Sequence, residues 1–285
     1  MKRTFCTFLA GLMIFAAGCS SQDAGSAVSQ AAPESQTVSQ PASSVLSQPE
    51  SEPEEKAELM ISAAASLTDC MNEIKTQYTA AHPNVTITYN FGSSGALQQQ
   101  IEQGAPCDIF FSAGKKQMQA LQDKSLVSDD SVKDVLENRV VLITPKDGKK
   151  LQSFEDLKNA DIKKIAVGEL KTVPVGQYTQ QVFDKMKLTG ALSSKIVYAQ
   201  DVRQVLSWVE TENVQAGVVY ETDAKISSKV AISCVAPDDS HDKVIYPVGV
   251  VKASKHPDEA QQFLSYLLGE DAKKVFTKYG FSSLV

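Results

Sequence analysis

The chain has 285 residues, of which 42% are hydrophobic, and a formal net charge of -6 at pH 7. The part after residue 57 is long enough for one large domain or two modest lobes. Lysine, arginine, aspartate and glutamate are interleaved rather than grouped. No basic stripe is therefore available to bind a phosphate backbone, and we discard nucleic acid as a partner.

The N-terminus has the three parts of an export signal. Two basic residues precede an apolar run over residues 5–17, and small residues then lead to Cys19. The run is short for a bilayer span, which favours a signal peptide over residues 1–19. Residues 16–19 resemble the bacterial lipobox, in which the cysteine receives a diacylglycerol and becomes the mature N-terminus. Ala16 stands where that motif usually has leucine, and a simply cleaved signal is the alternative.

Residues 20–57 consist mostly of serine, glutamine, proline, alanine and glutamate. With almost no aromatic or branched apolar side chains, this segment cannot offset the entropy lost on ordering. We expect a disordered tether between the signal and the folded part.

Three cysteines follow the tether, Cys70, Cys107 and Cys234. Their odd number and the lack of CxxC spacing predict neither a zinc site nor a disulfide framework. At most one pair could form, and the alternative is that each is a small core residue.

Short apolar strands alternate with amphipathic helices through the folded part. Residues 59–64 and 85–91 have strand patterns, and residues 67–81 between them have apolar side chains at helical spacing. Ser66 and Asp69 have the spacing of a capping box at a helix start. Further strands are predicted at residues 108–113, 140–143, 165–168, 196–199 and 216–220. This alternation predicts an α/β fold with mostly parallel sheets flanked by helices.

Four strand-to-helix junctions, at residues 63–66, 91–95, 173–176 and 200–202, are candidate ligand sites. In open α/β sheets, ligands bind at such junctions because unpaired N–H groups and the positive ends of helix dipoles converge there. Ser66 and Ser94 add hydroxyls, although each serine alone is better explained as a helix N-cap. Tyr220 ends an apolar strand, where a buried tyrosine usually needs one partner for its hydroxyl.

A serine hydrolase with Ser66 or Ser94 as nucleophile is the enzyme alternative. The segment GSSG at residues 92–95 is not a GxSxG elbow, because its second glycine comes one position early. None of the three histidines has a recognisable base position, and P-loop, GxGxxG and HExxH motifs are missing from the sequence. The residues therefore favour a binding module without a cofactor over an enzyme.

Six segments, taken together and in order, resemble the periplasmic molybdate-binding proteins over about residues 59–285. They are AAASLTD (63–69), FGSSG (91–95), QIEQGAPCDIF (100–110), VPVGQY (173–178), DVR (201–203) and GVVY (217–220). The resemblance implies a two-lobed, type II periplasmic-binding-protein-like fold. In this fold, crossing strands join two α/β lobes that close over one tetrahedral dianion in the cleft between them.

The resemblance also implies which residues bind the ion. Ser66 and Ser94 would each give a hydroxyl and a backbone N–H, Val175 and Val202 a backbone N–H only, and Tyr220 its phenol hydroxyl. The metal would be bound as its oxyanion, without direct protein ligands.

A shell of this kind contains neutral donors only. A buried dianion needs several charge-assisted hydrogen bonds, and fixed amides at helix starts supply them without a trapped countercharge. Such a shell disfavours hydrogen phosphate, since the proton on that ligand would find no acceptor. Sulfate would have to be excluded by the size of the cavity.

Arg203 adjoins Val202 and is one of two arginines after the signal. We expect it to be a solvated residue flanking the apolar stripe of its helix. If it entered the site, sulfate or phosphate would be favoured. The chain departs from the family at Val175, where alanine is usual, and at residues 169–170, where Glu-Leu replaces an Asn/Asp-Pro lead into the loop.

The sequence thus predicts a lipid-anchored, monomeric receptor that captures molybdate or tungstate and delivers it to an ABC-type permease. It would act on the outer face of the cytoplasmic membrane or in the periplasm. We expect lobe 1 at residues 58–138 and 247–285, and lobe 2 at residues 139–246. The alternatives are a receptor for sulfate, thiosulfate or another small anion, and an anchored serine hydrolase.

Overall fold

The strands of the computed structural model, which describes residues 56–285, form two sheets. The first contains β1 (Ala57–Ala64), β2 (Val85–Gly92), β3 (Ile109–Phe111), β4 (Lys133–Asn138), β10 (Val244–Val250) and β11 (Ser282–Ser283). The second contains β5 (Val140–Pro145), β6 (Ile165–Gly168), β7 (Ile196–Ala199), β8 (Ala216–Tyr220) and β9 (Val230–Val235). The expected signal with Cys19, and the tether up to residue 55, lie outside the described residues.

Both sheets are mixed, which corrects the expectation of mostly parallel sheets. Their orders are β11-β4-β10-β3-β1-β2 and β7-β6-β8-β5-β9. Parallel pairing is confined to β1 with β2 and β3, and to β6 with β7 and β8. The other pairs are antiparallel: β10 with β3 and β4, β11 with β4, and β5 with β8 and β9.

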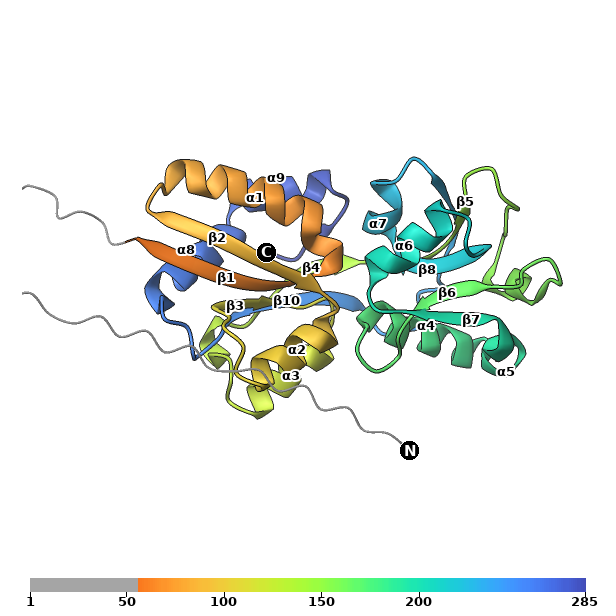
Figure 1. Ribbon diagram of the computed structural model, residues 1–285, viewed down its shortest axis with the longest axis horizontal. Coiled ribbons are helices and arrows are strands. Elements are labelled where there is room, and N and C mark those ends of the chain that lie inside the picture. Colours follow the sequence, from red (N-terminus) through yellow and green to blue (C-terminus); the bar gives the residue numbers. More distant parts are fainter. Residues whose placement is uncertain (1–55) are drawn as a thin grey trace, which may run out of the picture. The chain divides into compact units, whose positions relative to one another are not determined.

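Helices cover both faces of each sheet (Figure 1). The first sheet has α1 (Thr68–Ala81), α8 (Pro257–Leu267) and α9 (Glu270–Lys278) on one face and α2 (Ser94–Glu102) and α3 (Lys115–Asp123) on the other. The second has α6 (Val202–Glu210) and α7 (Glu221–Lys225) opposite α4 (Pro174–Lys185) and α5 (Thr189–Leu192). Short 3-10 helices are η1 (Ala65–Leu67), η2 (Asp129–Ser131), η3 (Phe154–Lys158) and η4 (Ser193–Lys195). We refer to the first sheet with its helices as the first lobe and to the second sheet with its helices as the second lobe.

The apolar core follows the predicted stripes. On α6, the residues predicted to form the stripe are all buried: Val202, Val205, Leu206 and Val209. One large cluster of buried side chains includes residues from both sheets, and a smaller one lies between the first sheet and α2 and α3. Among the described residues, Cys70 and Cys107 are buried free thiols and Cys234 is half-buried and free.

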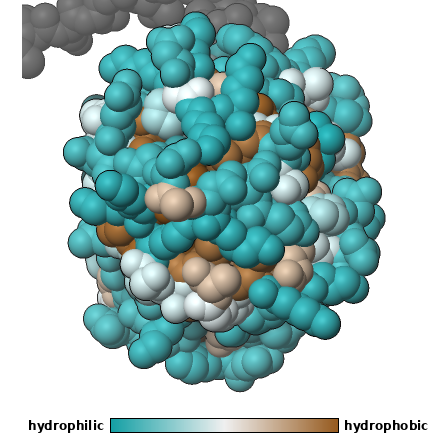
Figure 2. All heavy atoms as spheres, turned by 90° about the vertical axis from the view of Figure 1, so that its right-hand side faces the viewer, coloured by the Kyte–Doolittle hydropathy of each residue, from teal (hydrophilic) through white to brown (hydrophobic). Residues whose placement is uncertain are grey.

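The face of the second lobe that points away from the first lobe has a mostly hydrophilic surface. Figure 2 shows this face, with small apolar patches among hydrophilic residues. The exposed large apolar side chains of this lobe are Tyr198, Ile226, Ile232 and Val235. Scattered side chains of this kind are normal on soluble domains. Within residues 56–285, no helix has the length and apolarity that a membrane span requires.

The start of α4 is held against β6 by two glycines. A Cβ atom on Gly176 would lie 2.1 Å from the backbone oxygen of Gly168, and one on Gly168 would lie 2.5 Å from Cγ1 of Val173. At Gly176 the backbone of α4 therefore packs directly on the backbone of β6. This contact fixes the position of Pro174 and Val175, which begin the helix.

We expect Gly176→Ala to lower the free energy of unfolding by about 1 to 3 kcal/mol, because the backbone opposite cannot move aside as a flexible side chain can. Urea unfolding followed by circular dichroism measures the effect. Gly190→Ala in α5 is the matched control, since a Cβ atom there meets nothing within 4 Å. Equal stability of the two variants would contradict the close packing of α4 on β6.

Candidate functional site

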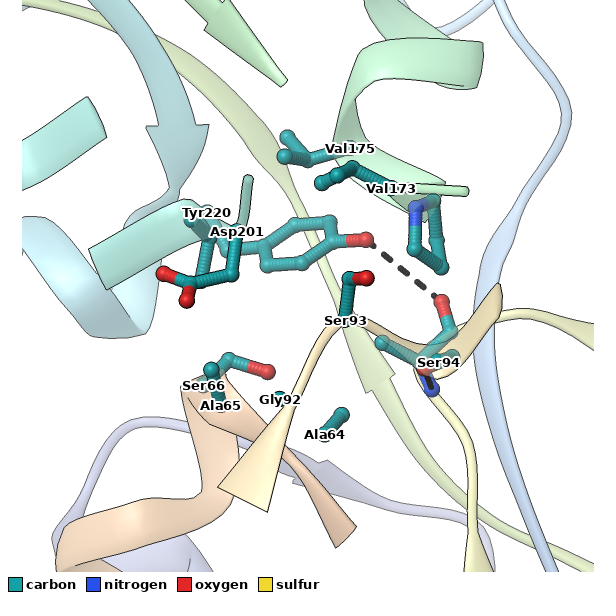
Figure 3. Close-up of a pocket in the computed structure, with 13 residues that line it drawn as sticks. Ala64, Ala65, Ser66, Gly92, Ser93, Ser94, Val173, Val175, Asp201 and Tyr220 are labelled. Carbon is teal, nitrogen blue, oxygen red and sulfur yellow. Dashed lines mark hydrogen bonds between the residues drawn. The ribbon is translucent and has the colours of Figure 1, made fainter. Parts of the chain in front are cut away.

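Four helix starts converge on one small cavity between the lobes (Figure 3). The helices are η1 and α2 from the first lobe and α4 and α6 from the second. All five residues predicted for the site line this cavity: Ser66, Ser94, Val175, Val202 and Tyr220. The empty space within it is small, about 210 Å³ even when the part open to solvent is included.

The backbone at these helix starts offers N–H donors. Ser94 and Val202 are the first residues of α2 and α6, and Val175 and Ser66 are the second residues of α4 and η1. N–H groups at such positions have no acceptor within their own helix. The positive ends of the helix dipoles add to their attraction for negative charge. The cavity is therefore suited to an anion.

Neither serine hydroxyl caps its helix, which corrects the simplest interpretation of both residues. Ser93, rather than Ser94, occupies the N-cap position of α2. The Oγ atom of Ser94 instead accepts a hydrogen bond from the backbone N–H of Ala113, at 2.9 Å. The Oγ atom of Ser66 lies 3.0 Å from the hydroxyl of Tyr246. Both hydroxyls are therefore oriented by residues distant in sequence.

Tyr220 contributes a buried phenol from the end of β8, with 1% of its surface exposed. Burial raises the pKa of Tyr220 well above its ordinary value, so the hydroxyl stays protonated and can donate. Its hydroxyl donates to the backbone oxygen of Ala113, at 3.5 Å. A contact of this length is weak, and the donor remains available to a ligand.

Two polar lining residues, Ser93 and Asp201, lie in predicted junctions but were not among the five predicted site residues. Ser93 is 6% exposed, and its hydroxyl points toward that of Tyr220 in Figure 3. The tandem serines of GSSG were the available signal. The Asp201 carboxylate caps α6 by accepting from the N–H of Gln204 at 2.9 Å, and Figure 3 shows it directed away from the serine hydroxyls. This carboxylate therefore serves the helix rather than the cavity.

Arg203 is not the solvated flank residue that we expected. Its Nη2 atom lies 2.5 Å from Oδ2 of Asp69 on α1, and its Nε atom lies 2.9 Å from Oδ1 of Asp223 on α7. The Asp223 side chain is fully buried. Asp69, expected to act in a capping box, thus forms an ion pair between the lobes. Since Arg203 is not among the residues lining the cavity, its charge is balanced outside the site.

Further contacts join the lobes beside the cavity. The N–H of Gly95 on α2 donates to the backbone oxygen of Thr172, just before α4, at 2.8 Å. The side-chain amide of Gln117 donates to that of Gln177 at 3.1 Å. The two lobes are therefore in direct contact around the cavity, as a closed cleft requires.

Comparisons with known proteins agree with this geometry. A family model described as bacterial extracellular solute-binding protein matches residues 59–282. The chain is 46% identical over 234 residues to the putative ABC transporter substrate-binding lipoprotein YvgL of Bacillus subtilis, covering 82% of this chain and 89% of that protein. It is 37% identical over 234 residues to the molybdate-binding protein ModA of Haemophilus influenzae, covering 80% and 91%.

A solved structure, the substrate binding domain of a putative molybdenum ABC transporter from Clostridium difficile, is 42% identical with a TM-score of 0.63. The match covers 81% of this chain and 100% of that one. The predicted two-lobed type II fold and the predicted family resemblance are both confirmed.

The buried carboxyl of Asp223 predicts a pH-dependent stability. Burial raises the pKa of Asp223 from 3.8 to about 7, although the guanidinium of Arg203 acts in the opposite direction. Since the folded chain then binds this proton more tightly than the unfolded chain, the contribution to stability is full below about pH 4 and is lost as the pH rises through about 7.

We therefore expect the wild type to lose stability relative to Asp223→Asn when the pH is raised from about 5 to about 8, because the amide stays neutral throughout. Urea unfolding of both proteins at each pH measures the difference. Parallel pH profiles for the two proteins would show that Asp223 does not titrate in this range.

Proposed function

We propose that this chain, which belongs to the family of bacterial extracellular solute-binding proteins, binds molybdate between its lobes and delivers it to an ABC importer. The observation that carries the proposal is the cavity itself, which four helix starts line with neutral donors. A relative that is 37% identical carries the name molybdate-binding protein, which supports molybdate as the ligand over sulfate.

A shell of neutral donors suits a tetrahedral dianion. Each oxygen of such an ion can accept charge-assisted hydrogen bonds, which are shorter and stronger than bonds between neutral groups. The hydroxyls of Ser66, Ser94 and Tyr220 and the amides of Val175 and Val202 are the proposed donors. Tungstate has the same charge and shape and would bind in the same way.

The serine hydrolase alternative finds little support at the site. The partners of Ser94 and Ser66 are a backbone N–H and a tyrosine hydroxyl, whereas an activated serine needs an adjacent general base. The family is one of solute-binding transport proteins. We therefore assign Ser66 and Ser94 to binding rather than to catalysis.

The predicted export signal supports a location outside the cytoplasm for the proposed receptor. The lipobox-like sequence ending at Cys19, and a relative named as a lipoprotein, support attachment through a lipid on this cysteine. A tether over residues 20–57 would let the lobes reach a membrane permease from the outer face of the cytoplasmic membrane or within the periplasm. The receptor would act as a monomer.

We expect molybdate and tungstate, each added separately, to raise the melting temperature of the purified chain, and sulfate, thiosulfate and phosphate to leave it unchanged. A ligand present at one hundred times its Kd stabilises the folded state by about 2.7 kcal/mol. Thermal unfolding followed by differential scanning fluorimetry measures the shift. A shift with sulfate and none with molybdate would refute the proposed ligand.

Ser94→Ala should weaken molybdate binding by about 1.5 to 3 kcal/mol, the usual loss for a hydrogen bond to a charged group. Isothermal titration calorimetry measures Kd directly. Ser265→Ala is the matched control, because the Ser265 hydroxyl is exposed on α8 and bonds to the backbone of its own helix. Equal affinities of the two variants would remove Ser94 from the site.

Gly95→Ala should oppose closure of the lobes while leaving each lobe folded. A Cβ atom on Gly95 would lie 2.5 Å from the backbone oxygen of Thr172 and 2.6 Å from its Cα atom. The lobes would have to separate, so molybdate affinity should fall about tenfold or more as the closed state loses population. Gly190→Ala again serves as control, and unchanged affinity in Gly95→Ala would mean that binding does not need this contact.

A further inference from the structure

The hydroxyl of Ser66 belongs to a series of buried hydrogen bonds that leads away from the cavity. It lies 3.0 Å from the hydroxyl of Tyr246, which accepts from the side-chain amide of Asn138 at 3.2 Å. The same amide donates to Oγ1 of Thr222 at 2.9 Å. All four side chains are buried, with exposed fractions between 0% and 7%. Tyr246, Asn138 and Thr222 are not among the residues lining the cavity.

The direction of these hydrogen bonds follows from the amide of Asn138. Its Oδ1 atom accepts from the backbone N–H of Arg139 at 2.9 Å, which fixes which end of the amide is the nitrogen. An amide nitrogen only donates, so the oxygen of Tyr246 is the acceptor in that contact. Burial raises the pKa of Tyr246, so the phenol keeps its single hydrogen. That hydrogen is left to donate to Ser66.

Ser66 is therefore an acceptor toward Tyr246, and its own hydrogen is free to point into the cavity. Ser94 is held in the same way by a different group. Its Oγ atom accepts from the backbone N–H of Ala113, which can only donate. Each serine oxygen thus accepts one hydrogen bond from a fixed donor and keeps its own hydrogen free for a ligand.

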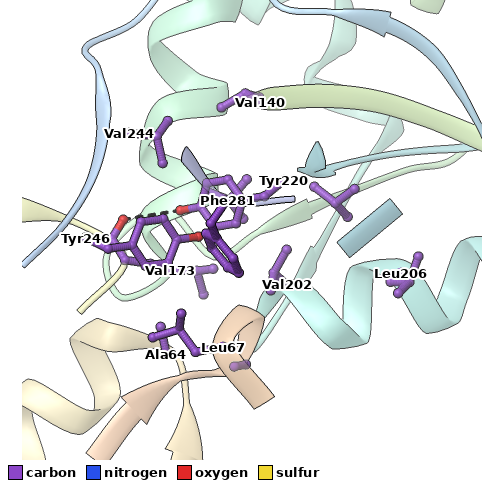
Figure 4. Packing of buried hydrophobic residues seen from close by; sticks show 14 of the residues in the cluster. Ala64, Leu67, Val140, Val173, Val202, Leu206, Tyr220, Val244, Tyr246 and Phe281 are labelled. Atoms are coloured by element: carbon purple, nitrogen blue, oxygen red, sulfur yellow. Dashed lines mark hydrogen bonds between the residues drawn. The ribbon is translucent and has the colours of Figure 1, made fainter. Parts of the chain in front are cut away.

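The groups that orient Ser66 lie where the chain passes between the lobes. Asn138 is the last residue of β4, and Tyr246 lies in β10, the first strand after the chain returns to the first sheet. The ring of Tyr246 packs against Phe281 and Tyr220, with centroids 5.4 Å and 5.8 Å away (Figure 4). This packing leaves the phenol little freedom to turn, so the orientation of Ser66 is set by the fold rather than by the ligand.

We propose that Asn138 and Tyr246 are positioning residues that hold the Ser66 hydroxyl as a donor and so make the cavity select oxyanions that carry no proton. The inference rests on the proposed function. A protonated anion such as hydrogen phosphate needs an acceptor for its hydrogen, whereas the Ser66 hydroxyl, with Tyr246 donating to its oxygen, presents its hydrogen to the ligand. Molybdate, which carries no proton at neutral pH, needs donors alone.

Tyr246→Phe tests this role. Without the phenol hydroxyl, Ser66 can turn and accept as well as donate. Molybdate affinity should fall about threefold to tenfold, the effect of one hydrogen bond. The ratio of the Kd for phosphate to the Kd for molybdate should fall as well, because a protonated ligand now finds an acceptor. Isothermal titration calorimetry at neutral pH gives both constants.

Tyr89→Phe is the matched control, since the Tyr89 hydroxyl bonds to the backbone oxygen of Met71 and does not line the cavity. It should leave the ratio unchanged. Asn138→Ala provides the same test by a second route, because it frees the Tyr246 hydroxyl to accept from Ser66. If the folded variants weaken both anions by the same factor, Asn138 and Tyr246 have a merely structural role and the inference is overturned.

A double substitution isolates the path through Ser66. If Tyr246 acts through Ser66, then Tyr246→Phe should not change the ratio further in a Ser66→Ala background. Independent, additive effects on the ratio would overturn the inference. Molybdate binding by the wild type distinguishes failure of this inference from failure of the proposed function. A wild type that does not bind molybdate refutes the function itself. A wild type that binds molybdate, with variants whose ratio is unchanged, refutes the positioning role alone.

Discussion

The desolvation of a doubly charged ion is the constraint on which the proposed site depends. A dianion that leaves water loses strong hydration, and the protein must replace it with hydrogen bonds that are already in place. Helix starts are well suited to this, because their N–H groups have no other partners and cannot turn away. One helix start supplies too few donors. The fold brings four together, two from each lobe, and this makes a closed cleft part of the binding site.

The rest of the structure keeps these helix starts close together and their surroundings neutral. At Gly176 the backbone of α4 packs directly on the backbone of β6, and at Gly95 the backbone of α2 packs on that of Thr172. The donors at these helix starts therefore lie close together. Arg203 joins the lobes beside the cavity, but Asp69 and Asp223 balance its charge. The ligand therefore meets donors rather than a cation. An ion held in this way can be released when the lobes separate, since no countercharge retains it.

The sequence predicted local features well. Seven strands and helices such as α1 and α6 were found from apolar periodicity, whereas β4, β9, β10 and β11 were not predicted. The five site residues, predicted from family motifs, line one cavity. The failures at and beside the site involve partners distant in sequence. Ser66 and Ser94 looked like caps because Tyr246 and Ala113 cannot be placed beside them by local pattern. Arg203 looked solvated for the same reason. Mixed pairing was missed because most of the antiparallel pairs involve β4, β9, β10 or β11, which were not predicted.

The most direct test of a neutral, donor-only site is a crystal structure of the chain with molybdate, in which anomalous scattering at the molybdenum edge locates the metal. The account predicts one molybdenum position in the cavity, with the oxygens of the ion in contact with Ser66, Ser94 and Tyr220 hydroxyls and with helix-start amides. It also predicts that Arg203 remains paired with Asp69 and Asp223. An ion bound elsewhere, or one in contact with Arg203 or a lysine, would contradict it.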